Sequence, residues 1–185
     1  MEGIRCKVKI KKVVWEYPEE DWVKYNTDGA ARGNPGENSY AFCLRDANAD
    51  LVYAEGERIE DITCTEAETR AILKAIKHCQ LAGINRAIIQ TDSLLLKQVL
   101  TGKWECPWNI AVEVDQIMEM MKAKNIHIQH IMREGNKLAD HIANLALDTG
   151  GCKYHHFREM DSKGRKIINA DKSKFYHIKV SLTKG

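Results

Sequence analysis

Polar and apolar residues alternate along several short stretches of the chain, the pattern of strands with one buried face. Residues 22–28 form such a stretch and lead into turn residues at 33–36, and residues 39–45 and 51–57 form two more. Gly, Pro, Asn and Asp mark the short connections between them. Three consecutive strands with short connections predict an antiparallel meander.

A helical period replaces this alternation after Cys64. Apolar residues recur at positions 71, 72, 75, 76 and 79, and Glu68 lies on the same stripe, one turn earlier. We therefore expect Glu68 at the start of the buried face of a helix that Thr65 opens. Thr65 and Glu68 also have the spacing of a capping box, so a role in capping alone is the alternative for Glu68, with Glu66 as a solvated neighbour.

The second half of the chain alternates strands and helices. The β-branched run at 86–91 ends at Asp92, and Ser93 is placed to cap a helix. The remaining predicted elements are that helix over 94–100, a helix over 108–122, a strand over 126–132, a turn at 133–135 and a helix over 136–147. The order of elements is therefore βββ, α, β, αα, β, α, which predicts an α/β fold.

Both ends of the chain show a second alternation. Apolar residues at positions 4, 6, 8 and 10 alternate with basic ones, and those at 176, 178, 180 and 182 alternate with His177, Lys179 and Ser181. Each stretch predicts a strand with one apolar face, which needs a partner. The candidate partners are the other end, residues 165–169, or a second copy of the chain in a dimer; partly unstructured tails are the alternative.

Charge divides the chain into three parts. The first twelve residues carry five basic and one acidic residue, residues 13–150 carry fourteen and twenty-two, and residues 151–185 carry nine and three. We expect an N-terminal basic strand and linker at 1–21, a central domain at 22–150 and a basic C-terminal extension, with strands, at 151–185. An acidic core needs metal ions or basic neighbours before it can approach a polyanion.

The remaining composition narrows the class of protein. Six cysteines are spread along the chain without a Cys-x-x-Cys pair, so neither a zinc module nor a disulfide framework is indicated. Apolar runs are short, and residues 1–7 lack the apolar core of a signal peptide. We expect an intracellular protein, cytoplasmic or nuclear, that does not contact a membrane.

Four carboxylates lie at informative places in these elements. Asp28 is inside the first strand of the meander, Glu68 starts a helix, Asp92 ends a strand and Asp140 lies in the first turn of the last helix. Mg²⁺ prefers oxygen ligands and is usually held by few carboxylates together with substrate phosphate. The four residues are therefore candidates for the metal site of a phosphodiesterase.

The segments around these carboxylates resemble type 1 ribonuclease H over about residues 22 to 148. The segments that carry the resemblance are Asn26-Thr27-Asp28-Gly29-Ala30, Gly33-Asn34-Pro35-Gly36, Ala67-Glu68, Thr91-Asp92-Ser93 and Arg133-Glu134-Gly135-Asn136 with Ala139-Asp140. The leader Trp15-Glu16-Tyr17-Pro18 and the segment at 133–136 look most like plant ribonuclease H-like domains, including those of retrotransposon reverse transcriptases.

This resemblance implies a five-stranded mixed sheet flanked by helices, with strands 1–3 antiparallel and strands 4 and 5 parallel to strand 1. It makes Asp28, Glu68, Asp92 and Asp140 the ligands of two Mg²⁺ ions, for which Mn²⁺ can substitute. The implied activity is hydrolysis of the RNA strand of RNA/DNA hybrids by two metal ions, leaving 5′-phosphate and 3′-hydroxyl ends. A reverse transcriptase domain in a longer protein is an implied partner.

The resemblance also implies substrate contacts from Gly29, Ala30, Asn34, Thr65, Ser93, Trp104, Arg133 and Asn136. Contacts to 2′-hydroxyls at the 33–36 turn would select RNA, whereas a plain β-turn explains the glycines equally well.

Two features depart from the family. The loop before the last helix has Arg133 and no histidine, and no basic protrusion separates the middle helices. We expect the basic ends to replace the protrusion, His130 and His141 to be packed or surface residues, and Trp108 to be in the core.

One alternative keeps the fold and removes the activity. A catalytically weak or inactive ribonuclease H-like module, fused to or partnering a reverse transcriptase, would bind nucleic acid without cutting it. Four converging carboxylates argue against this, because without metal they repel one another and the substrate. A nuclease of related fold for branched or single-stranded DNA is a more distant third.

Overall fold

The computed structural model describes residues 6–33 and 35–184, and its centre is a six-stranded mixed sheet. The strand order is β6 (Asn125–His130), β5 (Arg86–Thr91), β2 (Val23–Gly33), β3 (Gly36–Arg45), β4 (Leu51–Ile62) and β7 (Gly151–Tyr154). Strands β2, β3 and β4 are antiparallel, and β5 and β6 run parallel to β2. The predicted meander and parallel strands are confirmed, but the count of five omits β7, which pairs with β4.

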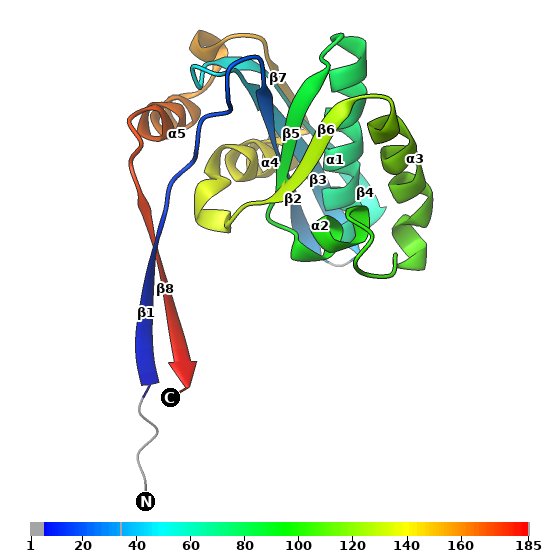
Figure 1. Ribbon diagram of the computed structural model, residues 1–185, viewed down its shortest axis with the longest axis horizontal. Coiled ribbons are helices and arrows are strands. Elements are labelled where there is room, and N and C mark those ends of the chain that lie inside the picture. Colours follow the sequence, from blue (N-terminus) through cyan, green and yellow to red (C-terminus); the bar gives the residue numbers. More distant parts are fainter. Residues whose placement is uncertain (1–5, 34, 185) are drawn as a thin grey trace, which may run out of the picture.

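Helices cover both faces of this sheet (Figure 1). Helices α1 (Cys64–Leu81), α2 (Leu94–Leu100) and α3 (Ala111–Lys122), the last preceded by the 3₁₀ turn η1 (Trp108–Ile110), share one apolar core with β2, β3, β5 and β6. Helix α4 (Lys137–Thr149) and helix α5 (Ser162–Lys172) contribute to a second core with β3 and β4 on the other face. The short 3₁₀ turns η2 (Arg133–Gly135) and η3 (Phe157–Glu159) precede α4 and α5.

The start of α1 differs from the prediction by two residues. Thr63 is the N-cap, its hydroxyl accepts from the Glu66 N–H, and the Glu66 carboxylate accepts from the Thr63 N–H at 2.7 Å. The capping box is therefore Thr63 with Glu66, and the expectation for Thr65 with Glu68 is wrong. Because Glu66 caps the helix, the Glu68 carboxylate is not used there.

The two ends of the described chain pair with each other. Strands β1 (Cys6–Val13) and β8 (His177–Lys184) form a separate antiparallel ribbon that extends away from the body (Figure 1). Residues 165–169 lie inside α5, so the alternative pairing with them is wrong. Position 4 lies outside the described residues, and the predicted dimer through these strands stays a prediction.

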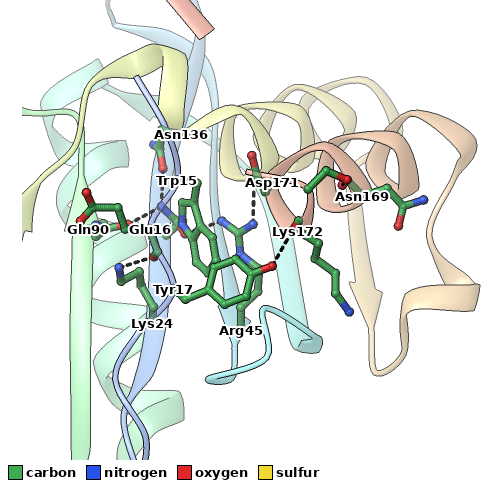
Figure 2. Close-up of polar contacts among 12 residues, drawn as sticks. Trp15, Glu16, Tyr17, Lys24, Arg45, Gln90, Asn136, Asn169, Asp171 and Lys172 are labelled. Carbon is green, nitrogen blue, oxygen red and sulfur yellow. Dashed lines mark hydrogen bonds and ion pairs between the residues drawn. The ribbon is translucent and has the colours of Figure 1, made fainter. Parts of the chain in front are cut away.

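The segments that flank the predicted central domain are also packed against it. Trp15, before β2, is buried, and Asp171 of α5 forms an ion pair of 2.6 Å with buried Arg45 of β3. Figure 2 shows Trp15 stacked beside Arg45, with α5 approaching from the other side. We call Trp15, Asn26, Arg45 and Asp171 the Arg45 cluster. Within the described ranges, no helix is long and apolar enough to span a bilayer.

Candidate active site

Two of the four predicted carboxylates are neighbours because of strand register. Thr27 of β2 pairs with Thr91 of β5 in a parallel ladder, so Asp28 and Asp92 follow at adjacent positions where β5 ends. The Asp28 side chain is 6% exposed, and its Oδ1 accepts from the Gly29 N–H at 2.9 Å. Burying one carboxylate beside a second one lowers the stability of the fold unless a positively charged group lies between or beside them.

Gly29 lets the third carboxylate approach. A Cβ built on Gly29 would lie 2.9 Å from the Glu68 nitrogen and 3.1 Å from the Ala67 Cβ. Only glycine therefore allows the first turn of α1 to pack against β2 at this point. The same close packing brings the start of α1, with Glu68, beside the middle of β2, next to the position of Asp28.

The fourth carboxylate is placed by Asn136. The Asn136 amide donates to the Thr27 carbonyl at 2.9 Å and accepts from the Asn26 amide at 3.1 Å, which fixes the start of α4 against β2. Asp140 follows one turn later, where it accepts from Asn144 at 3.3 Å. The Arg133 guanidinium lies 3.8 Å from the Asp140 carboxylate but is 79% exposed, so it screens the site without closing it.

The four residues act on one another electrostatically, and we call them the acidic cluster. Burial holds the pKa of Asp28 well above its usual range, and the carboxylates of Asp92, Asp140 and Glu68 raise it further. Burial also raises the pKa of Glu68 and of Asp92; Arg133 lowers both, and Ser93 lowers that of Glu68 through a hydrogen bond. Because the other three carboxylates all act on Asp28, the four predicted residues lie within electrostatic reach of one another.

The fit of a divalent cation rests on an unsatisfied oxygen. Asp92 Oδ1 is buried and has no hydrogen-bond partner among the described residues, although native proteins pair nearly all such atoms. In residues 6–33 and 35–184, no three His, Cys, Asp or Glu side chains are arranged to hold a metal ion by themselves. The residues therefore fit an open Mg²⁺ site that substrate phosphate and water complete, not a closed protein cage.

The predicted substrate contacts divide into three groups. Ala30, Thr65 and Ser93 are partly exposed near the acidic cluster, and Trp104 is 50% exposed in the connection before α3. Asn34 lies outside the described residues. The Asn136 side chain is 1% exposed with its amide bonded inside the protein, so the expectation that it contacts substrate is corrected: it positions α4.

Three other side chains also settle earlier expectations. Trp108 is 89% exposed, so its expected place in the core is wrong; η1 turns Ile110 inward instead. His141 is nearly buried and hydrogen-bonds Asp161 at 2.9 Å. His130 lies on the surface, and its Nε2 is 3.1 Å from the Asp92 carbonyl, a contact with the cluster that the sequence pattern did not indicate.

The sequence interpretation also missed the Arg45 cluster. Asn26 Oδ1 accepts from the Trp15 indole at 2.9 Å and from Arg45 at 2.8 Å, while its amide donates to Asn136 and Gln90. Asn26 and Asp28 are two residues apart on β2 and share a face of the sheet. The only sequence signal is an amide residue inside a strand, between Tyr25 and Thr27.

Comparison with protein families matches residues 26–146 to the family described as reverse transcriptase-like. The chain belongs to this family. The predicted ribonuclease H relationship is confirmed by similar proteins. Ribonuclease HI of Halobacterium salinarum is 30% identical over 128 residues. The aligned region covers 65% of this chain and 62% of that protein. Its crystal structure superimposes with a TM-score of 0.65 at 29% identity, covering 69% of this chain and 98% of that one.

A plant protein matches a longer part of the chain. A provisionally named ribonuclease H protein of Arabidopsis thaliana is 30% identical over 166 residues, which cover 88% of this chain and 26% of that protein. The match includes much of the chain outside the family segment. In both curated relatives, the matched region is thus less than two thirds of the relative's own length.

Proposed function

We propose that this member of the reverse transcriptase-like family is a divalent-metal-dependent ribonuclease H that hydrolyses the RNA strand of RNA/DNA hybrids. The observation that carries the proposal is the acidic cluster, in which buried Asp28 is repelled by its neighbours and Asp92 Oδ1 has no partner among the described residues. Such an arrangement costs stability unless cations join it. The ribonuclease H relatives support the choice of reaction.

Each residue of the cluster has a role in the proposed reaction. Asp28, Glu68, Asp92 and Asp140 would hold two Mg²⁺ ions, and Mn²⁺ would substitute. The chemistry that such ions supply when bound is activation of water and stabilisation of the leaving 3′ oxygen, which leaves a 5′-phosphate and a 3′-hydroxyl. Asp28 is the proposed bridging ligand because burial fixes it at the centre of the cluster.

Recognition of RNA requires contacts with 2′-hydroxyl groups. The main chain of Ala30 and the side chains of Thr65 and Ser93 are proposed to supply them, because each is partly exposed beside the carboxylates. Arg133 is exposed and 3.8 Å from Asp140, so its guanidinium can bind a phosphate at the edge of the site. In this proposal it supplies positive charge where the family's loop histidine is missing.

Glu68 and Glu66 provide a matched test of the proposal. Both lie near the start of α1, but Glu66 in the first turn caps the helix and Glu68, two residues later, contributes to the acidic cluster. We expect Glu68→Gln to abolish most cleavage of a labelled RNA/DNA hybrid in Mg²⁺. Glu66→Gln, which can still form the capping box with Thr63, should keep the activity and nearly all of the stability. EDTA should stop the wild type, and double-stranded RNA and DNA should not be cut.

Arg133 favours the second candidate function, an inactive module attached to a reverse transcriptase. Its guanidinium already pairs loosely with Asp140, as a substitute for a metal ion would. If the wild type binds hybrid but never cuts it in Mg²⁺ or Mn²⁺, this second function replaces the first. If Glu68→Gln and Glu66→Gln cut equally well, the assignment of the cluster is wrong.

A further inference from the structure

The β1–β8 ribbon separates charge from apolar surface. In an antiparallel pair, residues directly opposite each other point to the same side. Lys11 is opposite Lys179 and Lys9 is opposite Ser181, whereas Ile10 is opposite Val180. One side of the ribbon therefore carries Lys9, Lys11 and Lys179, and the other carries Ile10, Val180 and Ile178 together with Lys12.

The lysines on this basic face are available to a partner. Lys9 and Lys11 are exposed, and within residues 6–33 and 35–184 neither forms an ion pair. Lys179 is 3.9 Å from the Glu134 carboxylate, which neutralises it in part. Lys12, next along the strand, is on the opposite side and lies 4.6 Å from the centre of the Tyr176 ring.

The base of the ribbon adjoins the acidic cluster. Strand β8 contacts η2, where Glu134 pairs with Lys179 and the preceding Arg133 pairs with Asp140. A hollow of about 430 Å³ lies between the end of β1 and the ends of β5 and β6. Lys11, Gln90 and His130 are among its lining residues, and His130 also contacts the Asp92 carbonyl.

These contacts connect a basic surface to an acidic one. A duplex carries about one negative charge per 1.7 Å of its axis, and lysines that neutralise phosphates release bound counterions. Lys9 and Lys11 are two residues apart, about 7 Å along the strand, so they can contact separate phosphates. The acidic cluster repels phosphate, and the ribbon supplies the opposite charge beside it.

We propose that the basic face of the β1–β8 ribbon, with Lys9, Lys11 and Lys179, binds the phosphate backbone of the RNA/DNA hybrid outside the acidic cluster. The proposal rests on the proposed function for its choice of duplex. Binding would be independent of base sequence because lysine reads only the backbone. It would hold the hybrid while the hollow at the base of the ribbon leads one strand toward Asp92.

The test compares two pairs of lysines in the full chain. Lys9→Gln/Lys11→Gln removes charge from the basic face, and Lys77→Gln/Lys122→Gln removes the same charge from exposed positions on α1 and α3. Fluorescence anisotropy with a labelled 20-base-pair hybrid in EDTA measures binding without cleavage, over a series of salt concentrations.

We expect the Lys9/Lys11 variant to lose about tenfold or more in affinity at low salt and to lower the salt slope by about 0.9 for each lysine. The Lys77/Lys122 control should bind like the wild type, and both variants should keep its melting temperature. Equal affinity and slope in the Lys9/Lys11 variant would overturn the proposal, as would equal losses in both pairs.

Cleavage distinguishes this proposal from the proposed function. If the lysines govern binding but the wild type does not cut, the ribbon proposal stands and the assignment of activity fails. If the wild type cuts and the Lys9/Lys11 variant has unchanged binding and unchanged KM, the ribbon proposal fails alone. A rise in KM with unchanged kcat is the expected result for a residue that holds substrate without touching the reacting phosphate.

Discussion

The acidic cluster and the Arg45 cluster both include a residue of β2, Asp28 and Asn26 respectively, two positions apart. Their buried charges nevertheless have opposite surroundings. In the Arg45 cluster, the guanidinium pairs with Asp171 at 2.6 Å, donates to Asn26 at 2.8 Å and lies 3.5 Å from the Trp15 ring centre. In the acidic cluster, Asp28 is next to like charges and Asp92 Oδ1 has no partner in the described part of the chain. The Arg45 charge is paired inside the protein, although its buried Nε has no hydrogen-bond partner among the described residues. The acidic cluster has no such buried partner charge among them; exposed Arg133 lies 3.8 Å from Asp140.

This difference distinguishes a buried charge that supports the fold from buried charges that serve a functional site. A paired buried charge adds little net stability, but it fixes which segments meet, because removing either partner leaves the other uncompensated. An unpaired set of carboxylates weakens the fold and keeps affinity for cations from outside. The Arg45 cluster thus joins the leader and α5 to the strand on which the acidic cluster is displayed.

The largest expected effect comes from removing the central charge of the unpaired site. Asp28→Asn should lower cleavage by on the order of a thousandfold, since metal coordination supplies several kcal/mol at the transition state. It should also raise the melting temperature, because the amide removes a repelled carboxylate. Single-turnover cleavage and thermal unfolding measure the two effects; a less stable variant would contradict the comparison.

The paired site should respond in the opposite direction. Asp171→Ala leaves Arg45 buried without its carboxylate and should cost about 3–5 kcal/mol of the free energy of unfolding. The double variant Arg45→Met/Asp171→Leu should recover most of that loss, because it leaves no buried charge. Urea unfolding gives both numbers, and a loss below about 1 kcal/mol for Asp171→Ala would show that the pair is not structural.

The pH dependence of stability gives a smaller and more specific contrast. The folded-state pKa of Asp28 is raised, so the native protein holds this proton more tightly than the unfolded chain does. The loss of stability caused by the Asp28 charge is absent below the pKa of Asp28 in the unfolded chain. It develops as the pH rises from that value through the raised pKa of Asp28 in the folded protein. The melting temperature of the wild type should therefore fall relative to that of Asp28→Asn over this range, and Mg²⁺ should restore part of it. Parallel curves without metal would contradict the shift.

The smallest expected effect is the loss of one hydrogen bond from the paired site. Trp15→Phe removes the indole donor, while Asn26 Oδ1 still accepts from Arg45. We expect a cost of about 1 kcal/mol and unchanged cleavage. Trp22→Phe, at a partly exposed indole that packs edge-on against His127, is the control and should cost less. Lost activity in Trp15→Phe would link the two clusters more tightly than the hydrogen bonds indicate.

Local pattern predicted the end of β5 well and the start of α1 less well. Asp92 could be placed because β5 is a short β-branched run that stops there. Thr63 and Thr65 are each followed three residues later by glutamate, so the sequence allows two capping boxes. Packing decides between them, because the first turn of α1 must fit against Gly29.

Side-chain pairs between residues far apart in the sequence were not predicted. Arg45 and Asp171 are 126 residues apart, and neither stands out among the charged residues of its segment. Trp108 was misplaced because it begins a 3₁₀ turn in which Ile110, two residues later, is the buried side chain. These features depend on how elements far apart in the sequence pack together, which the periodicity of apolar residues within one element does not predict.

The pairing of β1 with β8 has a kinetic consequence. Ser181 donates to the Lys9 carbonyl across 172 residues of chain, so the ribbon closes a loop that contains the entire body. An isolated two-stranded ribbon is marginally stable in water. It should therefore form after the sheet and open without unfolding it, and its amides should exchange with solvent far sooner than those of β2.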